Sequence, residues 1–240
     1  MHFENKLMSG VLVKRYKRFL ADVRLSSGEQ VTIHCPNTGS MRNCQNPGST
    51  IWFTASMNKN RKYPHTWQLV EVDSGVLVGI NTGLANRLVL ESIQGKKIEK
   101  LQGYSKVRTE VSYGRENSRI DILLESAGLR NCFIEVKNVT LSRKKGLAEF
   151  PDAVTSRGLK HINELLKANK KGFEIYLFYV IQRNDCVKFD LAKDIDPNYC
   201  KLLLKAVKKN LNILCYDCKF STKGIELNRK IKLNFNARKF

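Results

Sequence analysis

The stretch R-I-D-I-L-L-E-S-A-G-L-R-N-C-F-I-E-V-K at residues 119–137 decides the fold of the C-terminal part of the chain. Apolar residues recur at every second position over 119–124 and again over 132–137, which is the period of a β-strand with one buried face. Gly128 lies between the two runs, and a three-residue turn requires a residue that adopts positive φ, as glycine does. The stretch therefore predicts a β-hairpin that turns at Gly128.

The predicted hairpin sets Asp121 directly across from Glu135, and Leu123 across from Phe133. Directly opposed residues have Cβ atoms roughly 5 Å apart, so the two carboxylates share one face, with Lys137 two residues further along it. Like charges at this distance repel, and one carboxylate resists ionisation unless a cation compensates. Because Mg²⁺ and Mn²⁺ prefer carboxylate, phosphate and water oxygens, the spacing indicates a site for either metal, held by Asp121 and Glu135.

Lys137 completes a set of groups suited to the cleavage of a phosphodiester. Beside a metal, a lysine orients or deprotonates a water, or stabilises the charge that develops on the phosphoryl group. The alternative is a solvated sheet face on which Glu135 and Lys137 form an ordinary ion pair, because a motif match is only a hypothesis. Spacing alone leaves both interpretations open.

The order Asp, hairpin, Glu-x-Lys resembles the PD-(D/E)xK nuclease superfamily, and the whole chain resembles the sugar fermentation stimulation protein A (SfsA) family. The segments that carry the second resemblance are R-Y-K-R-F-L-A-D-V (15–23), C-P-N-T-G-S-M (35–41), N-T-G-L-A-N-R-L (81–88), S-R-I-D-I-L-L (118–124), I-E-V-K-N-V-T-L (134–141) and F-P-D-A-V-T-S-R-G-L-K-H (150–161). The resemblance implies an oligonucleotide-binding-like (OB-like) N-terminal domain, a nuclease-like C-terminal domain and DNA binding. The superfamily's proline before the aspartate is replaced here by Ile120.

Many enzymes of that superfamily carry a further acidic residue on a helix before the first strand of the nuclease domain. Asn81 or Thr82 is suited to cap such a helix, which we expect to run to about Gln94, and Glu91 lies on it. The resemblance therefore makes Glu91 a candidate catalytic residue beside Asp121. Since this helix is apolar round most of its circumference, a surface salt bridge for Glu91 remains an equal alternative.

The composition points to a polyanionic partner. The 240 residues carry 42 Lys and Arg against 22 Asp and Glu, a net charge of +20. Such an excess favours nucleic acid, with DNA preferred, over an anionic membrane surface. No apolar run approaches the roughly 20 residues of a membrane span, and the N-terminus lacks a signal-peptide pattern, so we expect a cytoplasmic protein. Seven cysteines in such a protein indicate reduced thiols, although C-x-x-C at 215–218 leaves zinc as a minor alternative.

Residues 1–80 are expected to form a small all-β domain. Several short apolar runs with turn signals between them predict a sandwich or a five-stranded OB-like barrel, whose face and loops bind single strands. Within it, the run Lys14, Arg15, Tyr16, Lys17 and Arg18 interleaves cations with an aromatic ring. Bases stack on aromatic rings while cations follow the phosphates, so this run is the candidate nucleic-acid-binding segment, with a solvated edge as the alternative.

Residues 81–240 are expected to form an α/β domain in which helices cover both faces of a sheet. The run 174–182 is apolar on both faces, which predicts a central strand, and 213–216 is expected to be the last core strand. A helix is predicted from Pro151 and Asp152 to about Ala168. On it, Arg157 and His161 share one face, so both are candidates to hold a scissile phosphate if that face meets the carboxylates.

The C-terminal 201–240 holds eleven Lys and Arg against two acidic residues and is expected to act as a basic tail. Together these features predict a DNA-binding, Mg²⁺-dependent nuclease. The alternative is a non-catalytic DNA-binding regulator of sugar metabolism genes, with RNA binding in a ribonucleoprotein as a weaker third reading. The oligomeric state, a homodimer included, is left open by the sequence.

Overall fold

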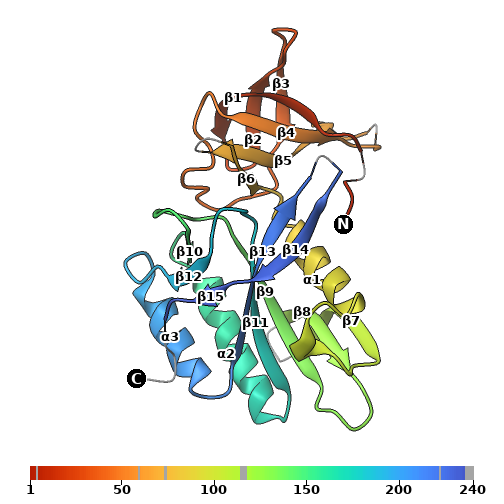
Figure 1. The fold of residues 1–240 in the computed structure, drawn as a ribbon, viewed down its shortest axis with the longest axis vertical. Coiled ribbons are helices and arrows are strands. Elements are labelled where there is room, and N and C mark those ends of the chain that lie inside the picture. The colour runs from red at the N-terminus through yellow and green to blue at the C-terminus, as the bar shows by residue number, and fades with distance from the viewer. Residues whose placement is uncertain (4, 59, 73–74, 114–117, 222, 236–240) are drawn as a thin grey trace.

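The computed structural model describes the whole chain except residues 4, 59, 73–74, 114–117, 222 and 236–240, and Figure 1 shows its two parts stacked along the long axis. The N-terminal part contains six strands: β1 (Met8–Tyr16), β2 (Leu20–Arg24), β3 (Gln30–His34), β4 (Thr50–Ala55), β5 (His65–Val72) and β6 (Val76–Gly79). Their order in the sheet is β3-β2-β1-β4-β5-β6. A parallel contact between His34 of β3 and Thr66 of β5 closes the first five strands into a barrel.

The barrel confirms the OB-like alternative over the sandwich. Its interior is filled by alternating inward-facing residues, among which Trp67 and Phe53 are almost fully buried. Large aromatic side chains supply much of the apolar area that a small barrel buries. By contrast, Phe19 in the turn between β1 and β2 is 44% exposed. Trp67 and Phe53 therefore belong to the core of the barrel and are not exposed to stack on nucleic-acid bases.

The C-terminal part is a three-layered α/β domain, as predicted. A six-stranded sheet has the order β14-β13-β11-β9-β8-β7, in which β9, β11 and β13 run parallel. The strands are β7 (Lys106–Tyr113), β8 (Ser118–Glu125), β9 (Cys132–Val139), β11 (Glu174–Ile181), β13 (Asn212–Phe220) and β14 (Ile225–Lys230). A small sheet joins β10 (Leu147–Phe150), β12 (Lys188–Leu191) and β15 (Lys232–Leu233).

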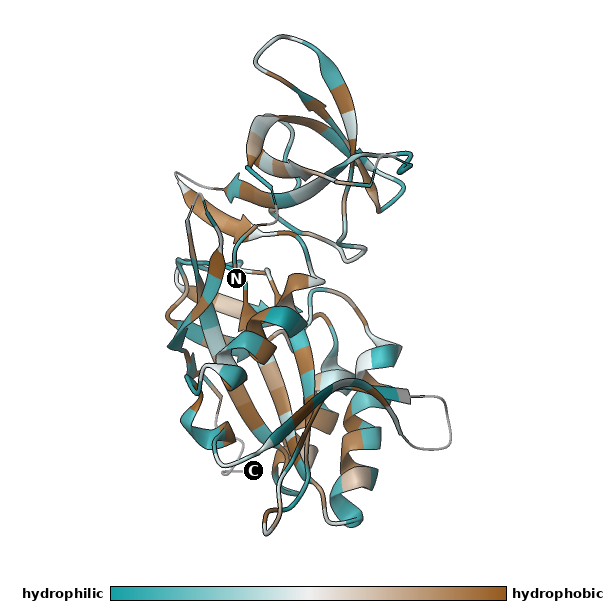
Figure 2. Cartoon of the chain, turned by 90° about the vertical axis from the view of Figure 1, so that its right-hand side faces the viewer, coloured by the Kyte–Doolittle hydropathy of each residue, from teal (hydrophilic) through white to brown (hydrophobic). Residues whose placement is uncertain are grey.

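Helix α1 (Leu84–Gln94) covers one face of the large sheet, while α2 (Ser156–Lys170) and α3 (Pro197–Val207) cover the other; a short 3₁₀ turn, η1 (Glu99–Leu101), follows α1. Apolar residues of β11 enter both cores, because odd positions such as Leu177 face α2 and even positions such as Phe178 face α1. Figure 2 shows the strands of this sheet as largely hydrophobic and the helices as mixed. Every helix in the described part of the chain is too short or too polar to traverse a lipid bilayer.

Two predicted elements are wrong at their ends. Helix α2 begins at Ser156, not near Pro151, because Thr155 caps it by accepting a hydrogen bond from the Gly158 amide. The run 213–216 is not the last core strand, since β13 continues to Phe220 and pairs with β14. The basic residues after 201 therefore lie mostly on α3, β13, β14 and β15 rather than in a tail, and 236–240 lie outside the described residues.

Direct contacts join the two parts. The Ser40 hydroxyl donates to the Asp152 carboxylate at 2.9 Å, so Asp152 serves the domain junction instead of opening a helix. The Thr82 hydroxyl donates to the carbonyl of Pro36, and Gln182 donates to the carbonyl of Asn81. These bonds hold the barrel against the edge of the large sheet at which the parallel strands β9 and β11 end.

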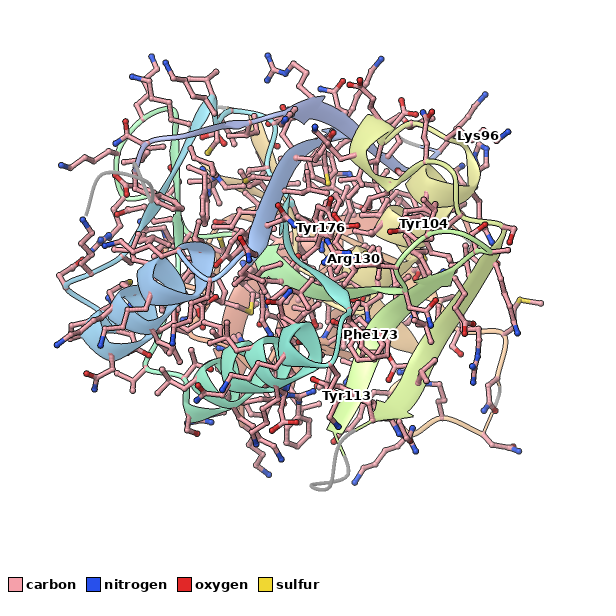
Figure 3. All side chains as sticks on the ribbon, turned by 90° about the horizontal axis from the view of Figure 1, so that it is seen from below. Lys96, Tyr104, Tyr113, Arg130, Phe173 and Tyr176 are labelled. Carbon is pink, nitrogen blue, oxygen red and sulfur yellow. The ribbon has the colours of Figure 1, made fainter. Side chains whose placement is uncertain are left out.

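The far end of the C-terminal domain, seen from below in Figure 3, carries two groups of aromatic residues on opposite faces of the large sheet. Tyr104 and Tyr176 both donate hydrogen bonds to the Glu174 carboxylate, at 3.1 and 2.9 Å. Phe133 packs between Tyr113 and Phe173, with ring centroids 5.0 and 4.3 Å away. The first group packs into the core under α1, and the second packs into the core under α2.

Candidate active site

The predicted hairpin is formed by β8 and β9 with the expected register. Leu123 pairs with Phe133 and Ile122 with Ile134, so Asp121 and Glu135 stand one step beyond the last pair of the ladder. There the strands separate, and the Asp121 Oδ2 atom accepts a hydrogen bond from the Val136 amide at 2.7 Å. Glycine 128 has the expected positive φ of 79°. The turn is longer than predicted, because residues 126–131 connect the strands.

Glu135 is the centre of the site. Its side chain is 3% exposed, and its Oε1 atom accepts a hydrogen bond from Lys137 Nζ at 2.8 Å and contacts His161 Nδ1. Lys137 Nζ and His161 Nδ1 are 3.2 Å apart, and Arg157 Nε lies 3.3 Å from His161 Nε2. The helix face that carries Arg157 and His161 therefore meets the carboxylates. One turn beyond His161 on the same helix, Glu164 is buried and pairs with Lys167.

The two carboxylates have opposite electrostatic environments. Burial raises the pKa of Asp121 to about 6, and the nearby negative charge of Glu135 adds to the shift against the hydrogen bonds from Val136 and Asn86. Burial alone would also raise the pKa of Glu135, but the Lys137 ammonium and His161 hold that pKa below its ordinary value. Glu135 is thus the stable anion of the pair, while Asp121 carries the unrelieved repulsion.

Asp121 and His161 line a cavity of about 480 Å³, and Glu135 reaches it only through its contact with His161. Three cationic side chains line it: Arg119 from β8, and Arg157 and Lys160 from α2. A cavity lined by both carboxylate and cationic side chains is suited to a phosphate that approaches together with a metal. Lys160 and Arg119 add two cations that the sequence analysis did not single out.

Two further lining residues were missed. Asn86 on α1 donates a hydrogen bond from Nδ2 to Asp121 Oδ1 at 2.9 Å, and Glu110 on β7 lines the same cavity. The register of β7 and β8 places Glu110 across from Asp121, and Glu110 has a positive φ of 52°. Asn86 lies within the segment 81–88, which is one of those that resemble the family. A single amide on an apolar helix has no spacing or charge pattern that would mark it as a site residue.

Glu91 is not brought to this cluster. Its carboxylate, 48% exposed, pairs with the N-terminal ammonium of Met1 at 2.8 Å. Successive residues of an α-helix are about 100° apart, so Glu91 points roughly 140° away from Asn86 around α1. The helix does contribute to the site, but through Asn86, and the expected role of Glu91 in catalysis has no geometric support.

The basic run at 14–18 has two kinds of members. Arg15 is pinned by hydrogen bonds to Gln45 and to the carbonyls of residues 18, 37 and 39, so it stabilises the loops of the barrel. Tyr16 donates to Asp22, and Lys14 lies 3.7 Å from the same carboxylate. Lys17 and Arg18 form an exposed turn with positive φ. Lys14, Lys17 and Arg18 are therefore the exposed cations of the run, while Arg15 is held within the loops.

The donor set suits a hard divalent cation. Asp121 and Glu135 offer carboxylate oxygens, and the raised pKa of Asp121 is the effect that a bound dication reverses. No group of three or more His, Cys, Asp or Glu side chains in the described parts of the chain is arranged to hold a metal. A two-carboxylate site leaves the remaining positions to water and phosphate, which is the usual mode for Mg²⁺.

Comparison with known proteins identifies the family. Residues 13–80 match the model of the SfsA N-terminal OB domain, and residues 83–224 match that of the sugar fermentation stimulation protein RE domain. A sugar fermentation stimulation protein homolog of Shewanella sp. (strain ANA-3) is 50% identical over 227 residues, which cover 95% of this chain and 97% of that protein. A homolog of Shewanella loihica is 50% identical over 218 residues, covering 91% and 93%.

A solved structure of Pyrococcus furiosus SfsA in complex with Ca²⁺ covers 98% of both chains with a TM-score of 0.86. Its sequence is 24% identical, so this likeness concerns the fold. The OB-like barrel and the layered α/β domain therefore occur together in a known protein. With matching family models over most of its length and relatives at half identity, this chain belongs to the sugar fermentation stimulation protein (SfsA) family.

Proposed function

We propose that this protein is a DNA-binding, Mg²⁺-dependent nuclease that hydrolyses phosphodiester bonds in the cavity of Asp121 and Glu135. The observation that carries the proposal is the convergence of two carboxylates, Lys137 and His161 beside a cavity that Asp121, His161 and three cationic side chains line. An isolated Glu-Lys ion pair needs neither the second carboxylate nor the cavity. The net charge of +20 supports a polyanionic substrate.

Each side chain has a distinct role in this proposal. Asp121 and Glu135 hold the metal, which when bound acts as a Lewis acid and lowers the pKa of a water. Lys137, held by Glu135 at 2.8 Å, orients the attacking water or takes its proton. His161 keeps Glu135 in place, since its Nδ1 contacts that carboxylate and its Nε2 faces Arg157.

The phosphate is held by the rim of the cavity. Arg157 and Arg119 present planar guanidinium groups suited to bidentate contact with phosphate oxygens, and Lys160 adds a point charge. Asn86 positions Asp121 from the opposite helix. The Ca²⁺ complex of the Pyrococcus furiosus relative supports a divalent cation in proteins of this fold, and Ca²⁺ shares the preference of Mg²⁺ for oxygen ligands.

Cleavage assays test the proposal. The purified protein is incubated with single-stranded DNA, double-stranded DNA and RNA, in Mg²⁺, in Mn²⁺ and in EDTA. We expect cleavage of a nucleic acid in either metal, none in EDTA, and none by Glu135→Ala or Lys137→Ala. Activity that persists in both variants would remove the assignment of the site.

Binding in the same preparations separates the nuclease from the alternative function. A protein that binds DNA with a strong salt dependence and shows no metal-dependent turnover is a non-catalytic regulator. Calorimetric titration with Mg²⁺ or Mn²⁺ in the absence of DNA gives a second readout. We expect heat of binding in the wild type and its loss in Asp121→Asn combined with Glu135→Gln.

A further inference from the structure

Helices α2 and α3 pack against each other on one face of the large sheet, and Figure 1 and Figure 3 show them side by side. Each helix leads into one of two adjacent parallel strands, α2 into β11 and α3 into β13, so both helices run in the same direction. Packed helices have axes about 8–10 Å apart. The side chains on the outer faces of the two helices therefore form one surface.

The exposed charges on this surface have one sign. We define the α2–α3 surface by the exposed cations of the two helices and of the residues directly after them: Arg157, Lys160, Lys167, Lys170, Lys171, Lys201, Lys205, Lys208 and Lys209. The acidic residue within these two segments, Glu164, is buried and pairs with Lys167. The surface therefore presents cations to solvent and no carboxylate of its own helices.

Three lysines of α3 form a stripe along the helix. Lys201, Lys205 and Lys208 are spaced at i, i+4 and i+7, so they lie on one side of it. In the described part of the chain, none of the three forms an ion pair. Residues 236–240 lie outside the described part, and their sequence contains two cations and no Asp or Glu. The charge of the stripe is therefore available to a partner.

The acids that precede α3 in the chain have other partners. Asp190 accepts a hydrogen bond from Asn234, and Asp194 pairs with Arg143. Asp196 caps α3 by accepting a hydrogen bond from the amide of residue 199. These carboxylates serve the loops and the start of the helix, rather than the lysine stripe.

The helix dipole explains only part of this pattern. A cation near the C-terminus of a helix stabilises it, and Lys205 and Lys208 occupy such positions on α3. Lys201 lies in the second turn of α3, and Lys160 lies in the second turn of α2. There the dipole gives a cation no advantage. Helix stability therefore does not account for a basic surface that extends over most of the length of both helices.

The α2–α3 surface continues into the candidate active site. Arg157 and Lys160 belong to both, because they line the cavity beside Asp121. The 15 residues of α2 extend the surface about 20 Å along the helix axis. A polyanion that binds along this surface therefore brings a phosphate to the cavity.

The side chains of the surface favour a duplex over a single strand. Single-strand binding relies on exposed aromatic rings on which unpaired bases stack. Within α2 and α3, Tyr199 is the residue of type Phe, Tyr or Trp, and it is buried. Lysine contacts phosphates as a point charge and reads no base sequence. The surface is thus suited to the phosphate backbone of a double helix.

We propose that the α2–α3 surface binds the phosphate backbone of double-stranded DNA and thereby places the duplex at the candidate active site. This inference rests on the proposed DNA substrate, but it requires neither a metal nor cleavage. Lys201, Lys205 and Lys208 supply contacts outside the cavity, since none of them lines it. Arg157 and Lys160 connect these contacts with the carboxylates.

Duplex binding in EDTA tests the surface in the full-length protein. A fluorescein-labelled DNA of thirty base pairs is titrated at several NaCl concentrations and read by anisotropy. The test variant combines Lys201→Gln, Lys205→Gln and Lys208→Gln. We expect its affinity at about 0.15 M NaCl to fall at least about tenfold. The slope of log K against log salt should decrease in magnitude by about 2–3, because each lost phosphate contact removes about 0.9.

The matched control removes the same charge from the opposite face of the large sheet. It combines Lys96→Gln, Lys97→Gln and Lys100→Gln, exposed residues that follow α1 or lie in η1. Figure 3 shows Lys96 on the side of the molecule away from α2 and α3. Because the net charge falls equally, a general effect of charge weakens both variants alike. We expect the control to keep the salt slope within about 1 of the wild type.

The outcomes separate this proposal from its alternatives. Equal losses in the two triple variants, or no binding of the duplex by the wild type, would overturn it. A labelled single strand that depends on the α3 lysines as strongly as the duplex does would also overturn it. Phosphatidylserine vesicles are the third probe. If the α3 variant loses vesicle binding and keeps duplex binding, the surface belongs to a membrane instead.

Two further results keep the test decisive. Duplex binding that depends on the α3 lysines, without any cleavage in Mg²⁺, would refute the nuclease proposal and support this one. If the triple variant does not fold, the single variant Lys205→Gln replaces it, with an expected decrease in salt slope of about 1. An unchanged slope in that variant would contradict the proposal.

Discussion

Two buried carboxylates of the same sheet differ in how their negative charge is compensated. Glu135 on β9 and Asp217 on β13 are separated by β11, and their side chains are 3% and 0% exposed. Asp217 accepts three hydrogen bonds from Arg229, from its amide at 2.6 Å, from Nε at 3.0 Å and from Nη2 at 2.7 Å. Glu135 instead contacts Lys137 and His161 and faces an opposed carboxylate, Asp121, which has its own hydrogen bonds to the Val136 amide and Asn86.

The difference teaches which feature of a buried acid indicates function. Asp217 lies at a register shift between β13 and β14, and its side chain satisfies the amide that the irregularity exposes. The Asp217 carboxylate is therefore compensated by Arg229 alone and leaves no charge for a ligand. At Glu135 the fold leaves a second carboxylate with a raised pKa facing a cavity. Unrelieved like charge beside a cavity, rather than burial beside a cation, distinguishes the candidate site.

The largest expected effect is on activity and comes from Glu135→Gln. Removal of the carboxylate that holds Lys137 and the metal should lower the rate of DNA cleavage by about 10²–10⁴-fold, because Lys137 loses the partner that positions it for proton transfer. Stability should change less, because the substitution also ends the repulsion with Asp121. The checks are a cleavage rate at saturating Mg²⁺ and a thermal unfolding curve. A fall in melting temperature as large as that of Asp217→Asn would erase the distinction between the two acids.

Asp217→Asn should show the reverse pattern. The variant loses charge-assisted hydrogen bonds to Arg229 in a fully buried position, and we expect about 3 kcal/mol of unfolding free energy to be lost. For a chain of this size that corresponds to a fall in melting temperature of roughly 6–12 °C. Cleavage per folded molecule at a temperature well below the transition should match the wild type. Lost activity in the folded variant would contradict a purely structural role.

Asp121→Asn tests the repulsion itself through pH. The folded pKa of Asp121, about 6, lies above its ordinary 3.8, so the folded state binds this proton more tightly than the unfolded state. Stability from this group is therefore present below about pH 4 and is lost as the pH rises to about 6. The unfolding free energy of Asp121→Asn minus that of the wild type should grow by about 2 kcal/mol from pH 4 to pH 7.

Mg²⁺ supplies the control for that experiment. A dication held by Asp121 and Glu135 should lower the pKa of Asp121 and raise the melting temperature of the wild type at pH 7. Asp121→Asn should respond much less to the same addition. If Mg²⁺ raised the melting temperature of both proteins equally, the cation would bind elsewhere. If the difference in unfolding free energy did not change with pH, Asp121 would not be destabilised by charge repulsion.

The sequence predicted the parts of the site that depend on local pattern. Alternation over 119–137 determines which residues share a face, so the register of the hairpin and the meeting of Asp121 with Glu135 followed from it. The helix spacing of Arg157 and His161 determined their shared face as well. Whether that face meets the sheet depends on packing in three dimensions, which no local pattern encodes.

The errors also have physical causes. Glu91 was chosen by its place in the chain, but an apolar helix without a clear stripe does not reveal its rotation, and Asn86 points to Asp121 instead. Pro151 suits the first turn of a helix, yet the side chain of Asp152 is taken by Ser40 of the barrel, and Thr155 provides the cap. Both outcomes depend on partners distant in sequence.

We expect the smallest effect from Glu91→Gln. Glu91 is an exposed carboxylate with which the buried Glu135 and Asp217 can be compared. Its partner is an ammonium, as for Glu135, but the Glu91 side chain is 48% exposed. Because solvent screens such a pair, we expect at most about 1 kcal/mol lost in unfolding free energy and a cleavage rate within about twofold of the wild type. Urea unfolding and the Mg²⁺ cleavage assay measure both. If cleavage falls as far as in Glu135→Gln, Glu91 belongs to the active site. Its pairing with Met1 would then not be the conformation in which the protein cleaves its substrate.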